Sequence, residues 1–164
     1  MAAAAAAAIS ELDPLKDAAA VVEEIVRLER KIFPKHESLS KSFHDELRKK
    51  NSGVMYLKTN KGKEGEEEIV GYVMYSWISS LCASITKLAV KEGHRRQGHG
   101  EALLKAAIQR CRRRKVQRIC LHVDPTRIDA LCLYRKLGFQ IDELIRQYYS
   151  PERNAYRMYL EFDE

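Results

Sequence analysis

The chain has 164 residues, of which 32% are charged, and its formal net charge is +6 at pH 7. This length predicts a single domain with a hydrophobic core of its own. No apolar run reaches the ~18 residues that a membrane span requires, and no secretory signal is recognisable, so neither a membrane protein nor a membrane partner is expected. The positive charge favours an anionic ligand or surface.

The four cysteines show no C-x-x-C pairing and lie in apolar stretches, at Cys82, Cys111, Cys120 and Cys132. Cysteines in such a context are expected to be reduced thiols in the core, rather than metal ligands or disulfide partners. Reduced thiols are typical of proteins inside the cell. We therefore expect a cytoplasmic location, with the nucleus as a second compartment to consider, and no metal.

The chain begins with an alanine-rich stretch. Residues 1–8 are a methionine and seven alanines, which have no core-forming pattern. We therefore expect a disordered lead, followed by one folded domain over residues 9–164. Ile9–Leu12 has the composition of a first short strand.

Two helices are expected next. The first should begin near Asp17, a typical N-cap residue, and end at Phe33-Pro34, because proline disfavours the helical conformation in the residue before it. Ser38 or Ser40 is expected to cap the second helix.

The rest of the chain alternates strands and helices. A charged loop over Lys58–Glu68 is expected to connect two strands of a hairpin. This order of elements predicts a mixed α/β domain whose sheet is covered by helices on both sides. The expected strands are Val54–Leu57, Ile69–Trp77, Cys82–Val90, Arg118–Val123, Gln140–Ile145 and Ala155–Phe162, and the expected helices are Gly100–Lys115 and Asp129–Leu137.

Residues 87–104 are expected to form a strand, a glycine-containing loop and a helix. Leu88 and Val90 alternate with Lys87, Ala89 and Lys91, which predicts a strand with one buried face. The loop contains the sequence R-x-x-G-x-G. Glycine lets the backbone approach a ligand closely, and the N–H groups of a helix start point toward it, so the loop favours a diphosphate. Glycines that serve the turn alone are the alternative.

Basic residues cluster at the end of the expected central helix, at Arg110, Arg112, Arg113, Arg114 and Lys115. Cations favour a helix C-terminus, where the helix dipole is negative, and this is the simpler explanation. RNA or ribosome contact is the alternative. The cluster has no interleaved aromatic residues for base stacking, so a nucleic-acid partner is not expected.

The loop resembles the R/Q-x-x-G-x-G/A signature of the GNAT superfamily of N-acetyltransferases. Two further stretches match that family: Leu121-His122-Val123, and the A-x-x-L-Y-x-x-x-G-F run over residues 130–139. The resemblance implies the GNAT fold, which is a mixed, mostly antiparallel sheet flanked by helices with a V-shaped splay between two central strands. It covers roughly residues 69–162.

The resemblance also implies that acetyl-CoA is the cosubstrate. In the family, the loop holds the pyrophosphate, and the pantetheine arm lies along the preceding strand and bonds to its backbone. The corresponding positions in this chain are Leu88, Ala89, Val90, Arg95, Arg96, Gln97, Gly98, His99, Gly100 and Glu101, together with Tyr134.

Two residues are implied in catalysis by the same resemblance. Tyr134 matches the tyrosine that faces the sulfur of CoA and protonates the departing thiolate, and its alternative role is packing on the sheet. His122 matches a histidine of eukaryotic protein N-alpha-acetyltransferases, which could accept a proton directly or through water. A satisfied core histidine is the alternative. A tyrosine base of a related enzyme corresponds to Ser84, and His36 and Glu37 are weaker candidates.

The resemblance to that subgroup implies that the acceptor is a protein N-terminus, gripped by Phe33, Pro34, Tyr148 and Tyr149. It also implies contact with an auxiliary subunit or a ribosome. Arg127 stands where the family usually has asparagine, so contacts to CoA could differ there. Acetylation of lysine or of a small amine such as a polyamine, and a regulatory subunit that holds CoA without turnover, are the alternative functions.

Overall fold

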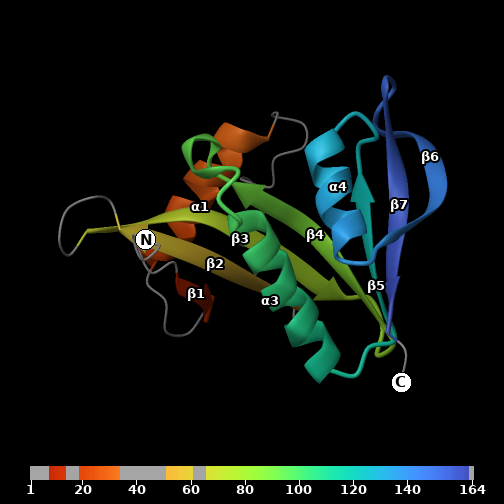
Figure 1. The fold of residues 1–164 in the computed structure, drawn as a ribbon. Coiled ribbons are helices and arrows are strands. Elements are labelled where there is room, and N and C mark those ends of the chain that lie inside the picture. The colour runs from red at the N-terminus through yellow and green to blue at the C-terminus, as the bar shows by residue number, and fades with distance from the viewer. Residues whose placement is uncertain (1–7, 14–18, 34–50, 61–65, 163–164) are drawn as a thin grey trace. The chain divides into compact units, whose positions relative to one another are not determined.

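A computed structural model describes residues 8–13, 19–33, 51–60 and 66–162 (Figure 1). Seven strands form one sheet in the order β1-β2-β3-β4-β5-β7-β6. The strands are β1 Ala8–Glu11, β2 Ser52–Asn60, β3 Glu67–Trp77, β4 Cys82–Val90, β5 Arg118–Val123, β6 Gln140–Ser150 and β7 Arg153–Glu161. The helices are α1 Ala19–Ile32, the short 3-10 helix η1 Glu92–His94, α3 His99–Arg113 and α4 Ile128–Lys136.

The pairing of the strands confirms a mixed α/β fold. β1 pairs antiparallel with β2, and β7 pairs antiparallel with both β5 and β6. β4 and β5 are parallel and pair from Cys82 opposite Arg118 to Ile85 opposite Leu121. β4 then continues to Val90, beyond the paired stretch.

The chain forms two compact units. The first contains the described residues up to Met74 together with Lys87–Ala106, and the second contains Tyr75–Thr86 and the described residues from Ala107 onward. The expectation of one domain over residues 9–164 stays a prediction.

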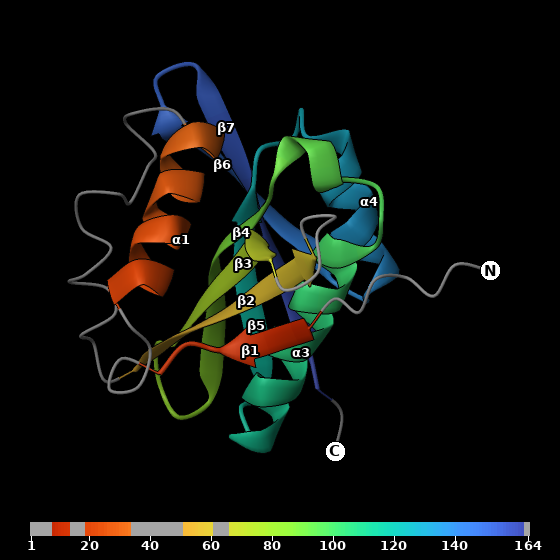
Figure 2. The same ribbon diagram turned by 90° about the vertical axis from the view of Figure 1, so that its left-hand side faces the viewer.

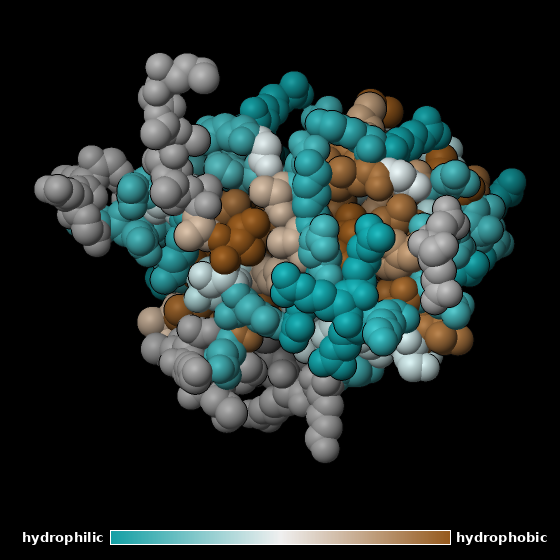
Figure 3. All heavy atoms as spheres, turned by 60° about the horizontal axis from the view of Figure 1, so that its bottom comes forward, coloured by the Kyte–Doolittle hydropathy of each residue, from teal (hydrophilic) through white to brown (hydrophobic). Residues whose placement is uncertain are grey.

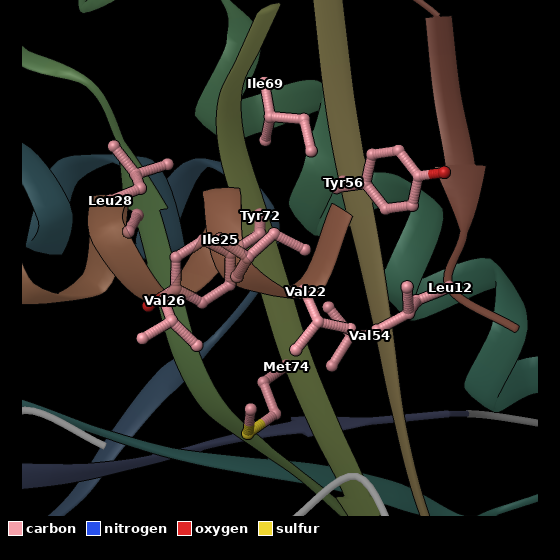
Figure 4. Packing of buried hydrophobic residues seen from close by; sticks show 11 residues of the cluster. Leu12, Val22, Ile25, Val26, Leu28, Val54, Tyr56, Ile69, Tyr72 and Met74 are labelled. Atoms are coloured by element: carbon pink, nitrogen blue, oxygen red, sulfur yellow. The ribbon is translucent and has the colours of Figure 1, made fainter. Parts of the chain in front are cut away.

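The core of the first unit lies between α1 and the strands β2, β3 and β4. In Figure 2, α1 covers one face of these strands and the first part of α3 lies on the other. The apolar residues of α1 recur every three or four positions, so they share one helix face, and Ile25 has no exposed surface. Figure 4 shows Val22, Ile25 and Val26 packed against Val54 and Tyr72 of the strands.

Gly71 permits a close approach between β3 and β4. A Cβ atom at this position would lie 2.9 Å from the carbonyl oxygen of Ala89 and 3.0 Å from Cδ1 of Leu103. Both distances are shorter than ordinary van der Waals contacts. The absence of a side chain at Gly71 therefore lets β3 lie close to both α3 and the end of β4.

The second unit has its own core, which contains the buried side chains Tyr75, Ile119, Leu121, Phe139 and Met158. α4 ends at Lys136, and the chain turns away two residues later at Gly138, whose φ of 100° lies in the left-handed region that glycine adopts at low cost. The amides of Leu137 and Gly138 donate to carbonyls of the last turn of α4.

Several strands are longer than the sequence indicates. β2 and β3 extend into the predicted loop Lys58–Glu68, as far as Asn60 on one side and from Glu67 on the other. β1 has the predicted length but begins one residue earlier, so Ala8 belongs to a strand and not to the disordered lead, whose residues 1–7 lie outside the described residues. The charged side chains of Lys58 and Glu67 made these strand ends look like a loop, but both are at least partly exposed while their backbone belongs to the sheet. Residues 61–65 lie outside the described residues. Lys58 and Glu67 approach to 3.9 Å across the two strands.

β6 was expected to end at Ile145 but continues to Ser150. The strand continues through an irregularity at Gln147, whose φ is 55° and whose amide donates to Oδ1 of Asn154. A local sequence pattern does not reveal such a side-chain contact. Tyr148 and Tyr149 consequently lie within a strand.

Two burial predictions are wrong. In β4, Ala89 is buried, whereas Leu88 and Val90 are only partly buried. Ala89 belongs to the core cluster that contains the apolar face of α1, and alternation alone does not reveal which face of a strand is better covered. Cys132 is exposed, because α4 buries Tyr134 as its core residue.

The predicted N-cap Asp17 and the second helix at Ser38 or Ser40 lie outside the described residues. No helix among the described residues is both long and apolar enough to cross a membrane.

Candidate active site

The loop between β4 and α3 carries the predicted diphosphate site. Nε of Arg95 donates to the carbonyl oxygen of Val90 at 2.9 Å, so this side chain folds back along the end of β4. Arg96 and Gly98 have φ angles of 62° and 81°, and the two left-handed residues turn the chain into α3. The amide of Ala102 donates to the carbonyl oxygen of Gly98 at 3.0 Å, which begins the hydrogen bonding of the helix.

This loop fits a diphosphate. A Cβ atom at Gly98 would meet no atom within 4 Å, so the space over the backbone is open to a ligand. α3 begins at His99, and the amides of its first turn point toward this side. Gly98 and the loop residues 95–97 are exposed to solvent. An anion could therefore reach the backbone amides directly.

Glu68 anchors the loop to β3. Its carboxylate lies 3.1 Å from Nζ of Lys91 and 3.3 Å from Nε2 of His94. The amide of Lys91 also donates to the carbonyl oxygen of Val70 at 2.7 Å. These contacts fix both ends of η1 before the chain reaches the glycines.

The predicted coenzyme residues of β4 lead directly into this loop. Leu88, Ala89 and Val90 form the last three positions of the strand, in the part that extends beyond the pairing with β5. Nζ of Lys87, one residue earlier, lies 3.6 Å from the centre of the Phe33 ring. Phe33, a predicted acceptor residue at the end of α1, therefore has a cation on its face. Pro34 lies outside the described residues.

In the second unit, three of the predicted residues form one aromatic cluster. The rings of His122 and Tyr148 are stacked, with centres 4.5 Å apart and planes 8° apart. Tyr149 meets Tyr148 edge to face at 4.9 Å. His122 belongs to β5 and both tyrosines belong to β6, so residues distant in sequence converge through β7, which pairs with both strands.

His122 is a neutral imidazole near pH 7. Burial lowers its pKa from the ordinary value of 6.5, and Arg157 lowers it further. Arg157 lies opposite His122 in the pairing of β5 with β7. The guanidinium of Arg157 donates to Asp142 at 2.8 Å and to Glu143 at 2.7 Å, which fixes its position. A neutral imidazole can accept a proton, as a general base must.

The sequence did not reveal a polar cluster that supports Tyr149. The buried carboxylate of Asp124 accepts hydrogen bonds from Nε of Arg153 at 2.9 Å and from Oγ1 of Thr126 at 2.7 Å. The guanidinium of Arg153 lies over the ring of Tyr149, 4.8 Å from its centre. The only sequence signal is the D-P-T run, which is typical of a side-chain-capped turn.

Tyr134 is buried in α4, and its ring meets that of Phe139 edge to face at 6.0 Å. Burial raises the pKa of its hydroxyl, an effect that Arg127 partly opposes. The phenol is therefore protonated at neutral pH and able to donate a proton. Burial raises the pKa of the Tyr149 hydroxyl, and Tyr148 and Tyr134 raise it further.

The cysteines give no sign of an activated nucleophile. Burial raises the pKa of Cys82 and Cys120, and it raises that of Cys111 to about 11. A protonated thiol is a poor nucleophile. Within the described ranges, no group of His, Cys, Asp and Glu side chains is arranged to hold a metal ion.

The predicted site residues therefore form two groups, one in each unit. The first unit holds the loop with the predicted residues Arg95, Arg96, Gln97, Gly98, His99, Gly100 and Glu101. The second holds the cluster of His122, Tyr148 and Tyr149, and also Tyr134. The roles of these residues stay predictions.

Comparisons with known proteins identify the family. A model of the acetyltransferase (GNAT) family matches residues 20–139, which is most of the chain. An N-alpha-acetyltransferase of Sulfurisphaera tokodaii is 29% identical over 149 residues, covering 84% of this chain and 85% of that protein. A putative ribosomal protein bS18-alanine N-acetyltransferase of Bacillus subtilis is 32% identical over 109 residues, covering 66% of this chain and 68% of that protein.

A solved structure of Arabidopsis thaliana NAA60 in complex with acetyl-CoA has the same fold. Its TM-score is 0.81 at 17% identity, and the match covers 97% of this chain and 100% of that chain. The family match and the names of the relatives point to the same family as the sequence of the glycine-containing loop. The chain therefore belongs to the acetyltransferase (GNAT) family, as an acetyl-CoA-dependent N-acetyltransferase.

Proposed function

We propose that this enzyme acetylates the α-amine of protein N-termini, by direct transfer within a complex of enzyme, acetyl-CoA and acceptor. The observation that carries the proposal is the stacking of a neutral His122 on Tyr148, with Tyr149 beside it. The names of the relatives support it, since they describe N-alpha-acetylation and acetylation of a ribosomal protein at alanine.

Acetyl-CoA supplies the acetyl group as a thioester. Backbone amides from Arg95 to Gly100 would hold its pyrophosphate, and the backbone of Leu88–Val90 would hold the pantetheine arm as an added strand does. The open space over Gly98 and the exposed end of β4 support these roles. Holding both reactants in position supplies much of the acceleration in such a transfer.

The transfer needs one proton removed and one proton supplied. The amine nitrogen bonds to the acetyl carbon, the bond from that carbon to sulfur breaks, and sulfur leaves as a thiolate. His122 would accept the proton from the amine, directly or through water, and the Tyr134 hydroxyl would donate to the thiolate. The raised pKa of Tyr134 and the lowered pKa of His122 place each group in the protonation state that its role requires.

The acidity of the acceptor favours an α-amine over lysine. An α-amine has a pKa near 8 and a lysine side chain one near 10.4, so at neutral pH deprotonating the lysine costs roughly 3 kcal/mol more. A base whose pKa lies below 6.5 suits the less basic amine. Tyrosine side chains can also bond the first backbone groups of an extended peptide while their rings limit its first side chain.

A panel of peptides tests the proposal. Each sequence is offered with a free N-terminus, with a blocked N-terminus, and with or without lysine, and acetylation is followed by mass spectrometry. We expect acetylation of the free N-termini, whether or not lysine is present. Acetylation of the blocked peptides with lysine, and not of free N-termini, would move the enzyme to the lysine acetyltransferases. Binding of acetyl-CoA without turnover on any amine would indicate a regulatory subunit.

Contact with a ribosome or an auxiliary subunit, and a cytoplasmic or nuclear location, are further parts of the proposal. One solved structure of similar fold is a NatC complex bound to a peptide and CoA, with a TM-score of 0.80 at 20% identity. Co-purification of the tagged enzyme with ribosomes, with and without nuclease treatment, would test the ribosomal contact.

A further inference from the structure

A surface outside the proposed site lies in the second unit, where the β3–β4 hairpin meets the end of α3. The carbonyl oxygen of Leu81 accepts hydrogen bonds from the amides of Gln117 at 2.7 Å and Arg118 at 3.3 Å. The guanidinium of Arg114 lies 4.0 Å from the centre of a ring of Trp77. The hairpin and the basic end of α3 therefore form one continuous surface.

Two aliphatic side chains at this hairpin are strongly exposed: Ile78 by 67% and Leu81 by 52%. The hairpin that carries them is well ordered by hydrogen bonds. The amide of Ile78 donates to the carbonyl oxygen of Cys82 at 3.0 Å, and Oγ of Ser79 accepts from the amides of Leu81 and Cys82 at 3.2 Å. The fold thus holds both apolar side chains in water, which costs free energy unless a partner covers them.

The surroundings of these side chains are strongly positive. Residues 69–91 and 102–123 contain no aspartate or glutamate, and residues 110–118 contain six arginines and lysines. Arg112 contacts the ring of Phe162, and Arg118 pairs with Glu161. Helix-dipole compensation accounts for the cations in the last turn of α3, but not for the exposed aliphatic pair beside them. We call the group formed by Ile78, Leu81, Arg113, Arg114, Lys115 and Arg118 the hairpin patch.

We propose that the hairpin patch binds the surface of an anionic lipid bilayer. Aliphatic side chains at a hairpin tip can enter the interface between headgroups and acyl chains, while cations around them attract the phosphates. Figure 3, which looks toward the end of α3, shows teal hydrophilic and brown hydrophobic residues next to each other on the surface. This mixture of charge and apolar area is complementary to a headgroup layer.

RNA fits the patch less well. Single-stranded nucleic acid is bound by stacking bases on exposed aromatic rings. Three aromatic rings lie near these cations, and each already has an arginine across it: Trp77 with Arg114, Phe162 with Arg112 and Tyr159 with Arg118. Trp77 is also only 9% exposed. Aliphatic side chains such as Ile78 and Leu81 offer no stacking surface. A phosphate backbone would use the cations and leave both aliphatic residues in water.

The sequence led us to expect no membrane partner, because no segment is apolar enough to span a bilayer. Association with a bilayer surface requires no spanning segment, and the exposure of Ile78 and Leu81 becomes visible only in the fold. The hairpin patch shares no residue with the proposed coenzyme or acceptor groups, so its test is independent of the acetylation test.

Co-sedimentation of the full-length chain with vesicles tests the inference. We expect binding to vesicles of phosphatidylcholine with phosphatidylserine, weak binding to phosphatidylcholine alone, and loss of binding at high salt. The double variant Ile78→Ser/Leu81→Ser and the double variant Arg113→Glu/Lys115→Glu should each lower the partition coefficient by about tenfold or more.

Matched controls separate the patch from general effects of charge and apolarity. Arg27→Glu/Arg30→Glu makes the same charge change on α1, and Ile128→Ser/Leu144→Ser removes two other exposed aliphatic side chains. We expect each control to change partitioning by less than about threefold.

Three results would overturn the proposal. The first is no difference between the two kinds of vesicle, and the second is an equal loss of binding in the patch variants and their controls. The third is binding of an oligouridylate that Arg113→Glu/Lys115→Glu abolishes and Ile78→Ser/Leu81→Ser leaves unchanged, together with no vesicle binding. That result would assign the surface to RNA.

Discussion

The imidazole of His122 lies parallel to the ring of Tyr148, with ring centres 4.5 Å apart and planes inclined by 8°. Stacking on an aromatic face holds the orientation of the imidazole while leaving its ring edge accessible. The same stacking shields the imidazole from water, and the resulting burial lowers its pKa. This contact therefore orients the imidazole and, together with Arg157, favours its neutral form.

Replacement of His122 should change the pH dependence of turnover. Because burial and Arg157 lower the pKa of His122 in the free enzyme, we expect the acidic limb of kcat/KM below pH 6.5. His122→Gln should remove this limb and lower kcat by about tenfold or more. Arg157→Gln should move the limb toward pH 6.5. Unchanged profiles in both variants would show that His122 is a packing residue.

The same pKa shift affects stability. In the unfolded chain, His122 has its ordinary pKa of 6.5 and binds a proton that the folded state binds less well. The contribution of His122 to the free energy of unfolding should therefore decrease as the pH falls below about 6.5. Urea unfolding of wild type and His122→Gln over this range would measure it. A variant with the same pH dependence as wild type would contradict the expectation.

Tyr134→Phe should lower kcat by about tenfold or more and leave acetyl-CoA affinity within about twofold. The deleted hydroxyl matters when negative charge develops on sulfur, so its loss belongs to the transition state. The buried ring and its contact with Phe139 remain in the variant. Single-turnover kinetics measure the effect on the chemical step, and calorimetry measures the effect on acetyl-CoA affinity. Unchanged turnover under conditions in which chemistry limits the rate would show that Tyr134 only packs in the core.

Gly98→Ala should weaken acetyl-CoA binding by about tenfold or more, because a methyl group would occupy the open space over the backbone. The φ of 81° adds a folding cost of roughly 1 kcal/mol. Gly93→Ala is the matched control, since a Cβ atom there also meets nothing within 4 Å and the position has no positive φ. Calorimetry that gives equal affinities for both folded variants would exclude the loop from the coenzyme site.

Arg153→Ala should raise the KM of the peptide acceptor without changing acetyl-CoA affinity. The variant removes the cation over Tyr149 and leaves the buried carboxylate of Asp124 without its 2.9 Å partner. We expect a loss of stability of about 1–3 kcal/mol. Arg153→Lys keeps the positive charge, so it should recover part of the affinity for the peptide acceptor and part of the stability. If the peptide KM of Arg153→Ala equals that of wild type, Arg153 only stabilises the fold.

Gly71→Ala should destabilise the first unit by about 1–3 kcal/mol, because its methyl group would lie 2.9 Å from a backbone carbonyl of β4. A backbone atom cannot move aside as a flexible side chain can. Thermal unfolding monitored by circular dichroism measures the change. A melting temperature equal to that of wild type would show that the two strands can separate locally without cost.

Strong local patterns allowed accurate prediction of some elements. β4 and β5 have the predicted bounds, because each is an apolar run that ends at a clear turn or polar residue. The resemblance of the loop and of the L-Y-x-x-x-G-F run predicted the family, which the comparisons confirm. The stacking of His122 on Tyr148 brings together two residues that the sequence assigned to one site.

Contacts between residues far apart in sequence explain what was missed. Arg153 and Asp124 are 29 positions apart, and neither residue alone indicates the other. The end of β6 depends on the side chain of Asn154, seven positions from Gln147. The burial of Ala89 depends on packing against α1, which strand alternation does not describe.

The four cysteines differ in their exposure to solvent, so one of them can be labelled selectively. Cys132 is exposed, whereas Cys111 and Cys120 are buried, and burial raises the pKa of Cys82, Cys111 and Cys120. A maleimide dye at neutral pH should therefore label Cys132 first. The dye would lie on α4, two positions before Tyr134. Its emission could report how acetyl-CoA and peptide affect this helix without any engineered cysteine.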